Sequence, residues 1–139
     1  MKRFGKIFAC ILAIFMLLGS VSCAPSTEKI DTLLKEWETA GKISYSKSED
    51  ADAFLNTIKI KTGLEIDKSG VTAAYSVVDE TFHTLWIIEF DQKSDARKLC
   101  REKPQQFYGN DEVDYTVKRK GNVVFLGSAE LLDAFLNEV

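Results

Sequence analysis

The sequence predicts an α+β domain in which two N-terminal helices precede a ββαββα unit. That unit is expected to form a four-stranded antiparallel sheet with its helices packed on one face of it, and the two N-terminal helices are expected to cover an edge or the second face. Three observations support this. Apolar residues recur at helical spacing in four segments, two pairs of β-rich runs lie among them, and short polar turns join the runs within each pair. Strands joined by such short turns must be antiparallel.

Two amphipathic helices are predicted first. One begins at Ser26 or Thr27, ends at Gly41, and places these residues on one face: Ile30, Leu33, Leu34, Trp37 and Ala40. The other follows Ser48 and ends at Gly63, with an apolar face of Ala51, Phe54, Leu55 and Ile58. Acidic side chains in its first turn favour the helix dipole: Glu49, Asp50 and Asp52.

The first strand pair is predicted at residues 71–78 (VTAAYSVV) and 84–90 (TLWIIEF), with residues 79–83 as the hairpin turn. In the second of these strands both faces are apolar. Leu85 and Ile87 point one way, and the opposite face carries Trp86, Ile88 and Phe90. Such a strand is expected at the centre of a sheet that is covered on both sides.

A short helix capped by Asp91 or Ser94 is predicted next, and it must end before Pro104. Residues 105–114 are expected to be a polar loop. The second strand pair is predicted at residues 115–120 and 123–126, joined by a two-residue Gly-Asn turn. A last helix follows Ser128 as its cap, with Leu131, Leu132, Phe135 and Leu136 facing inward.

The residues before Cys23 have a different composition. Lys2, Arg3 and Lys6 are the only charges in the first 22 positions, and residues 7–18 form an unbroken apolar run. A basic start, an apolar core and small residues at the end are typical of a secretory signal peptide. Twelve helical residues rise about 18 Å, short of the ~30 Å hydrocarbon core. We therefore expect residues 1–22 to be a signal peptide, with a retained membrane anchor as the alternative.

The end of this leader, Gly19-Ser20-Val21-Ser22-Cys23, resembles the lipobox of bacterial lipoprotein precursors, in which small residues precede an invariant cysteine. Val21 and Ser22 match the positions before the cysteine, whereas Ser20 stands where the family usually has Leu. The resemblance covers the leader alone. It implies that Cys23 becomes linked to diacylglycerol and, after cleavage, forms the acylated N-terminus. Ordinary cleavage near Ser22, which gives a secreted protein with a free thiol, is the alternative.

This interpretation divides the chain into three parts. Residues 1–22 are the signal peptide, residues 23–26 are the lipidated Cys23 with a short tether, and residues 27–139 are a single α+β domain. Two or three acyl chains hold a protein firmly on a membrane. The expected location is therefore a bacterial membrane, with the domain close to its surface on the extracytoplasmic side.

The charge of the chain also changes when the leader is removed. The 18 basic residues less the three in the leader leave 15 against 21 acidic residues, a net charge of −6 instead of −3. Nucleic acid is excluded as a partner, because binding it requires clustered Lys and Arg. The basic run Lys118-Arg119-Lys120 is expected to be a charged turn that opposes aggregation. Contact with anionic lipid headgroups is its alternative role.

Cysteine and histidine offer little chemistry. Cys10 leaves with the leader and Cys23 takes lipid, so Cys100 has no partner for a disulfide. Its helical spacing with Ala96 and Leu99 predicts a buried, inert residue. The alternative is a reactive thiol whose pKa is lowered by two flanking arginines, Arg97 and Arg101. His83, the only histidine, is expected to be exposed at a hairpin tip.

No catalytic residue, metal site or cofactor is predicted. The chain contains no CxxC, HExxH, GxSxG, GxxxxGK[ST] or GxGxxG motif. The acidic segment Asn110–Asp114 could hold calcium, but it lacks the spacing of an EF-hand, and a solvated loop is preferred. The sequence identifies no ligand-binding residues either.

The predicted function is therefore a membrane-anchored, noncatalytic binding or protein-interaction module, with a possible protein partner in the cell envelope. Two alternatives stay open: an inhibitor or immunity-type protein, and an envelope enzyme that uses carboxylates. A large hydrophilic cleft with two facing carboxylates would favour the enzyme. An exposed apolar or edge-strand patch would favour the interaction module.

Overall fold

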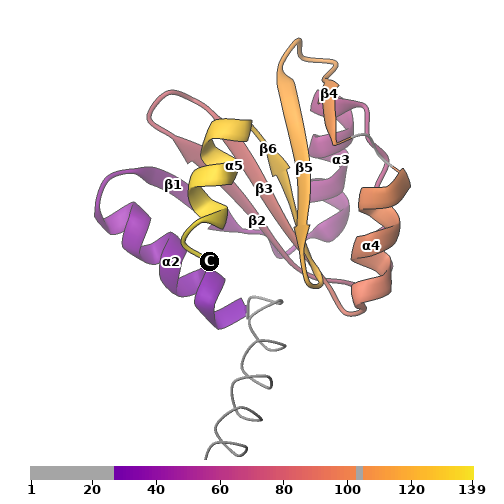
Figure 1. The fold of residues 1–139 in the computed structure, drawn as a ribbon, viewed down its shortest axis with the longest axis horizontal. Coiled ribbons are helices and arrows are strands. Elements are labelled where there is room, and N and C mark those ends of the chain that lie inside the picture. The colour runs from indigo at the N-terminus through magenta and orange to yellow at the C-terminus, as the bar shows by residue number, and fades with distance from the viewer. Residues whose placement is uncertain (1–26, 103–104) are drawn as a thin grey trace, which may run out of the picture.

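The computed structural model describes residues 27–102 and 105–139, so the predictions for the signal peptide and for Cys23 lie outside it. The described residues form four helices and six strands (Figure 1). None of these helices has the length and apolar character needed to cross a membrane. In chain order the elements are α2 (Thr27–Thr39), β1 (Ile43–Lys47), α3 (Ala51–Thr62), β2 (Val71–Asp79), β3 (Thr84–Phe90), α4 (Lys93–Glu102), β4 (Gln106–Tyr108), β5 (Asp114–Lys120), β6 (Val123–Gly127) and α5 (Ala129–Leu136).

The six strands of the described residues form one antiparallel sheet in the order β1-β2-β3-β6-β5-β4. Two hairpins, β2–β3 and β5–β6, make its inner part, and they meet between β3 and β6, where Ile87 lies opposite Phe125. β1 pairs with β2 over its full length, and the short β4 pairs with β5. β1 and β4 are therefore the two edges of the sheet.

The predicted four-stranded sheet is wrong, and so is an N-terminal region made of two helices alone. β1 lies between α2 and α3, and β4 lies within the predicted polar loop. β1 (ISYSK) alternates, with Ile43 buried and Tyr45 partly buried on the first core, but two apolar residues in five are too few to identify a strand from the sequence. β4 has three residues, too few to show any period. Both form because an inner strand offers them backbone hydrogen bonds, and that partner is invisible in the local sequence.

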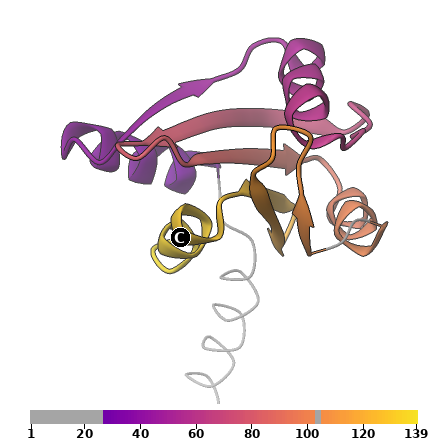
Figure 2. The same cartoon turned by 90° about the horizontal axis from the view of Figure 1, so that it is seen from above.

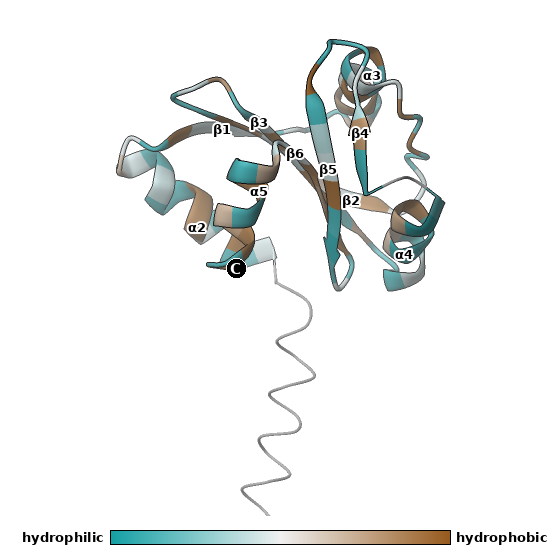
Figure 3. Cartoon of the chain, turned by 45° about the horizontal axis from the view of Figure 1, so that its top comes forward, coloured by the Kyte–Doolittle hydropathy of each residue, from teal (hydrophilic) through white to brown (hydrophobic). Residues whose placement is uncertain are grey.

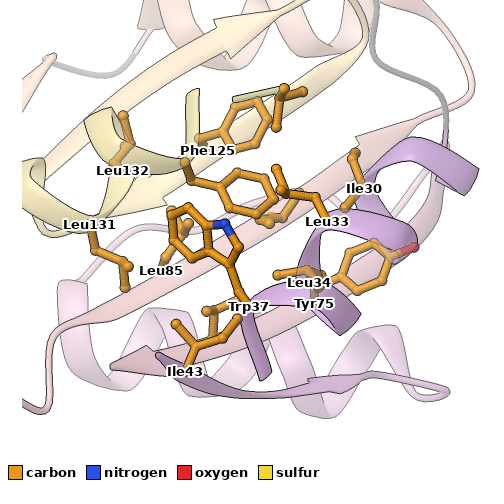
Figure 4. Packing of buried hydrophobic residues seen from close by; sticks show 14 of the residues in the cluster. Ile30, Leu33, Leu34, Trp37, Ile43, Tyr75, Leu85, Phe125, Leu131 and Leu132 are labelled. Carbon is orange, nitrogen blue, oxygen red and sulfur yellow. The ribbon is translucent and has the colours of Figure 1, made fainter. Parts of the chain in front are cut away.

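Helices cover both faces of the sheet. Seen from above, α3 lies on one side of the long strands β2 and β3 and α5 on the other (Figure 2). The core beneath α2 and α5 is packed around Trp37, whose ring meets that of Phe135 edge-on at 5.4 Å (Figure 4). Its buried members are Ile30, Leu33, Leu34, Trp37, Ile43, Ala73, Tyr75, Val77, Leu85, Ile87, Val123, Phe125, Leu131, Leu132, Phe135 and Val139.

A second core lies beneath α3 and α4. Its buried members are Phe54, Leu55, Ile58, Ala74, Trp86, Ile88, Phe90, Ala96, Tyr115, Val117, Val124 and Leu126. β3 therefore sends alternate residues into the two cores, which confirms the prediction of a central strand covered on both faces. Hydrophobic and hydrophilic residues alternate along the covering helices, as expected for elements with one buried side (Figure 3).

The two ββα units are not equivalent in space. Two halves that meet at the antiparallel strands β3 and β6 would be related by a twofold axis normal to the sheet. Such an axis would place α4 and α5 on the same face. α4 instead packs on the second core and α5 on the first, so the expectation of both helices on one face is wrong. The physical reason is the two-sided β3, which needs cover on each face.

Several predicted helix ends and turns are confirmed. Gly63 ends α3 with φ 83°, as predicted. The helix begins at Ala51, so Asp50, which was predicted in the first turn, is instead the cap and accepts a hydrogen bond from Ala53 N at 3.1 Å. Gly121 in the β5–β6 turn has φ 62°, a conformation that glycine adopts without strain. Ser128 is the residue before α5, as predicted, but its side chain makes no capping hydrogen bond.

The start of α2 lies beside the β5–β6 turn. Thr27 Oγ1 donates a hydrogen bond to the Glu89 carboxylate of β3. Glu89 lies opposite Val123 in the sheet, and Val123 lies opposite Lys120. The start of α4 lies at the same lower end of the molecule (Figure 1). We call this region, defined by Thr27, Glu89 and the turn between Lys120 and Val123, the α2 end of the domain.

Candidate functional site

A groove with cationic walls lies between α4 and β5 and has a volume of about 600 Å³. Among the described residues that line it, four are basic and none is acidic, although the whole chain is acidic. We call it the cationic groove. Its lining residues are Arg97, Cys100, Arg101, Gln105, Val117, Lys118, Arg119 and Leu136.

α4 makes one wall because its apolar residues face the sheet. Ala96 is fully buried in the second core, and Leu99 packs against that core from the edge of the helix. Arg97 and Arg101 lie one helical turn apart on the exposed side and both line the groove. Like charges at this spacing repel by roughly 0.2–0.5 kcal/mol, a cost that a bound anion would remove.

β5 makes the other wall, and both of its faces contribute. Val117 points into the second core, so Arg119, two residues on, lies on the same α4 side. Its Nη1 donates to the carbonyl oxygen of Gly121 at 2.8 Å, which ties the guanidinium to the β5–β6 turn. Lys118 lies on the opposite face, where its Nζ is 2.6 Å from Asp133 of α5. The groove therefore curves around the margin of β5.

No binding site was predicted here, but two of the four cations belong to the basic run, which was expected to be a charged turn with contact to lipid headgroups as the alternative. Lys118 and Arg119 of the basic run line the groove, whereas Lys120 donates a hydrogen bond to the Val139 carbonyl oxygen and is not among the lining residues. In the sequence, Arg97 and Arg101 are singled out only as neighbours of Cys100. Their spacing of four residues on the exposed side of a predicted helix was a signal that could have linked them to the basic run.

Cys100 lies in the groove and is half-buried, so the prediction of a buried cysteine is wrong. It sits at the margin of the apolar face of α4, where the groove opens beside it. Burial raises the pKa of its thiol, against a smaller lowering by the Arg119 charge, and the net pKa lies above the ordinary 9.0. The thiol is therefore protonated at neutral pH, which contradicts the alternative of a thiol with a lowered pKa.

His83 is at the tip of the β2–β3 hairpin, as predicted, but its ring is held in place. Nδ1 lies 3.0 Å from Asp79 and 2.8 Å from the Thr81 hydroxyl, and Nε2 lies 3.6 Å from Glu130 of α5. Burial raises the pKa of Asp79, but hydrogen bonds from the His83 and Thr81 backbone and side chains outweigh it, and the net pKa is lowered. These contacts join the hairpin to α5.

The two acidic segments singled out in the sequence have local structural roles. Asp50 is the cap of α3. In the loop before β5, the Asp111 carboxylate accepts a hydrogen bond from the Tyr115 hydroxyl at 2.6 Å. The backbone N–H of Asp111 donates to the carbonyl oxygen of Lys61 in α3. Across residues 27–102 and 105–139, no group of three or more His, Cys, Asp or Glu side chains is arranged to hold a metal ion.

A second cavity, which the sequence analysis missed, lies on the other side of α4 and has a volume of about 200 Å³. We call it the acidic cleft, because four carboxylates and one lysine surround its apolar floor. Hydrogen bonds from the Ser69 backbone and hydroxyl lower the pKa of Asp67, so this carboxylate is ionised at neutral pH. The lining residues are Glu65, Ile66, Asp67, Ser69, Phe90, Asp95, Lys98, Leu99 and Glu102.

Features expected of an interaction module are also present among the described residues. β1 and β4 are edge strands. Phe82, in the β2–β3 turn, is 86% exposed and has φ 63°. The other exposed large apolar residues, Ile60, Tyr108 and Val113, belong to α3, to β4 and to the loop before β5. Phe82 lies on a different turn, so these side chains do not mark a single docking face.

Comparison with protein families, curated proteins and solved structures found no match to this chain. The chemistry of its own residues therefore carries the functional conclusion. Four cations on facing walls select an anionic ligand, because guanidinium groups donate paired hydrogen bonds to phosphate or carboxylate oxygens.

Proposed function

We propose that this chain is a bacterial lipoprotein, anchored through lipid on Cys23 and facing the extracytoplasmic side, whose domain is a noncatalytic binding module for an anionic ligand. The cationic groove is the observation that carries the binding role. The leader and its lipobox-like end carry the anchor.

The composition of the groove supports binding of an anion. Its basic side chains come from two elements, and only Lys118 has an acidic partner in the described residues that could compete for it, Asp133. That ion pair is about half exposed, so it contributes little and exchanges with solvent readily. Arg97, Arg101 and Arg119 keep their charge at any physiological pH. The groove therefore offers an anion permanent positive charge on both walls.

The state of the carboxylates supports a noncatalytic role. A carboxylate enzyme needs one group that keeps a proton near neutral pH, and this requires a raised pKa. In the acidic cleft the shift of Asp67 has the opposite direction. Asp79, beside the single histidine, also has a lowered pKa. Ionised carboxylates of this kind accept hydrogen bonds and attract cations, but they have no proton to donate.

The anchor is tested by replacing Cys23 with alanine. The expected product is an unprocessed, unlipidated precursor, because the thioether needs the thiol and the specialised cleavage follows lipidation. Intact mass and partition into detergent measure this. Cys10→Ala is the matched control, since Cys10 lies within the apolar run and should leave processing unchanged. A Cys23→Ala chain that still has the mature mass and partitions with membrane would falsify the anchor.

The binding role is tested with pyrophosphate as the probe. Calorimetric titration of the purified full chain should show binding that weakens as salt is added. The double variant Arg97→Gln, Arg119→Gln should weaken it by about tenfold or more, since charged hydrogen bonds contribute roughly 1.5–3 kcal/mol each.

Lys98→Gln is the matched control for this titration. It removes one positive charge from the same helix, but Lys98 lines the acidic cleft and not the groove. It should change the affinity by less than about twofold. Equal loss in both variants, or no pyrophosphate binding by the unmodified chain, would contradict the groove as the binding site.

A further inference from the structure

We infer that the anion bound by the cationic groove is the headgroup of an acidic phospholipid beside the anchor, one with a net negative charge, so that the groove docks the domain on its own membrane. This inference rests on the proposed anchor at Cys23. It adds a ligand class and an orientation: the groove faces the bilayer, and the opposite side of α4 faces away from it.

The length of the tether is the first argument. Four residue steps separate Cys23 from Thr27, and fully extended chain spans at most about 3.6 Å per residue, so this reach is about 14 Å. A domain held so close to a bilayer meets headgroups at a high effective concentration. A free phosphate in solution has no such advantage.

The position of the groove relative to the tether is the second argument. Thr27 is hydrogen-bonded to Glu89, and the register runs from Glu89 through Val123 to Lys120. Those steps cross two strand spacings, about 10 Å. The Arg119 backbone therefore lies near the α2 end of the domain, although its side chain is on the α4 face of the sheet and Thr27 is on the opposite face.

Lys118, which pairs with Asp133 of α5, is the groove cation on the same face as Thr27. Charges interact with headgroups over roughly 8 Å at physiological ionic strength. A tether of at most about 14 Å allows the groove cations to come within that distance of the bilayer.

The charge asymmetry of α4 is the third argument. Arg97 and Arg101 line the groove on one side of the helix, whereas Asp95 and Glu102 line the acidic cleft on the other. An anionic surface attracts the first side and repels the second. The domain would therefore be oriented with the groove against the headgroups and the acidic cleft away from them. Each cation near such a surface strengthens binding by about fivefold.

Cys100 supplies a native reporter of this docking, because it lies in the groove and is half-buried. With the leader removed and Cys23 lipidated, it is the one thiol left in the chain. A headgroup seated between Arg97 and Arg119 would cover it. The rate at which an uncharged maleimide labels Cys100 therefore measures occupancy of the groove.

The experiment uses the lipidated full-length product reconstituted in nanodiscs. We expect labelling to be several-fold slower in discs containing phosphatidylglycerol than in discs of phosphatidylcholine alone, with the difference removed by high salt. The double variant Arg97→Gln, Arg119→Gln should label equally fast in both discs, and Lys98→Gln should keep the difference. Since local pH at the anionic surface acts on all three proteins alike, the contrast between the variants isolates the groove.

Three outcomes would overturn the inference: equal rates in both discs for the unmodified protein, an equal loss of the difference in the Lys98→Gln control, or the same slowing in phosphatidylcholine discs on adding inorganic phosphate. The last would identify a soluble phosphate as the ligand. The intact mass of the same sample reports the anchor separately. A chain without diacylglycerol on Cys23 contradicts the anchor. Equal labelling rates in the two kinds of disc, measured on a chain that is lipidated, contradict the docking alone.

Discussion

The cationic groove and the acidic cleft are the two sides of one helix. α4 gives Arg97 and Arg101 to the groove, and it gives Asp95, Lys98 and Glu102 to the cleft. The groove is completed by β5, and the cleft by the segment between α3 and β2. A helix on the surface of a sheet thus separates two sites of opposite charge, because residues one or two positions apart point in different directions around its axis.

The two sites also differ in how their titratable groups respond to their surroundings. In the groove, burial raises the pKa of Cys100 above its ordinary value, so the neutral form is favoured. In the cleft, hydrogen bonds lower the pKa of the exposed Asp67, so the charged form is favoured. Near neutral pH the Cys100 thiol is therefore uncharged, whereas the Asp67 carboxylate is ionised.

The largest effect is expected from a substitution in the second core, on which α4 and therefore both sites depend. Trp86 is 1% exposed in the second core beneath α4, and its ring stacks on Tyr115 at 5.6 Å. Trp86→Ala should lower the free energy of unfolding by about 3–5 kcal/mol, measured by urea denaturation. Both sites should lose their structure together. Pyrophosphate affinity retained at wild-type strength in a destabilised variant would show that the groove does not depend on this core.

A pair of charge reversals at adjacent positions separates the two sites. Arg101→Glu puts a carboxylate in the groove and should weaken pyrophosphate binding by about tenfold or more. Glu102→Lys changes the charge by the same amount in the cleft, and the expected change in affinity is within about twofold. Titration calorimetry measures both. If the two reversals have equal and opposite effects, net charge governs binding and the groove has no special role.

The smallest expected effect concerns the thiol in the groove. Since burial raises the pKa of Cys100 above 9.0, its alkylation rate should still be increasing at pH 9. Arg119 favours the thiolate, so Arg119→Gln should move the midpoint of the rate profile to still higher pH. A stopped-flow pH profile with an uncharged alkylating reagent measures this. A midpoint below pH 9, or a downward shift in the variant, would contradict a half-buried thiol beside the Arg119 charge.

Elements with strong periodicity could be predicted from the sequence, and weak edge elements could not. The alternation in β3 predicted its central place because each residue there is buried on one face or the other. β1 has a single fully buried residue, and β4 has three residues in all. Their existence depends on inner strands that are remote in the sequence. The assignment of α4 and α5 to opposite faces likewise depends on which face each connection reaches.

The candidate site was predictable to the extent that its charges are neighbours in the chain. Lys118 and Arg119 form a visible basic run, and a helical spacing of four joins Arg97 to Arg101. The placement of these two pairs around one groove is a property of packing, since α4 lies beside β5 with Ala96 buried on the sheet. The acidic cleft arises in the same way from segments about 30 residues apart, such as Asp67 and Asp95.

The sequence by itself determined the helical faces, the inner strands, the turns at Gly63 and Gly121, and the prediction of a leader that ends at Cys23, because each depends on residues within a few positions of one another. The tertiary structure alone decided the six-stranded order, the two-sided placement of the helices and the meeting of Arg97 with Arg119. Those features depend on long-range burial of apolar surface, which local spacing does not encode.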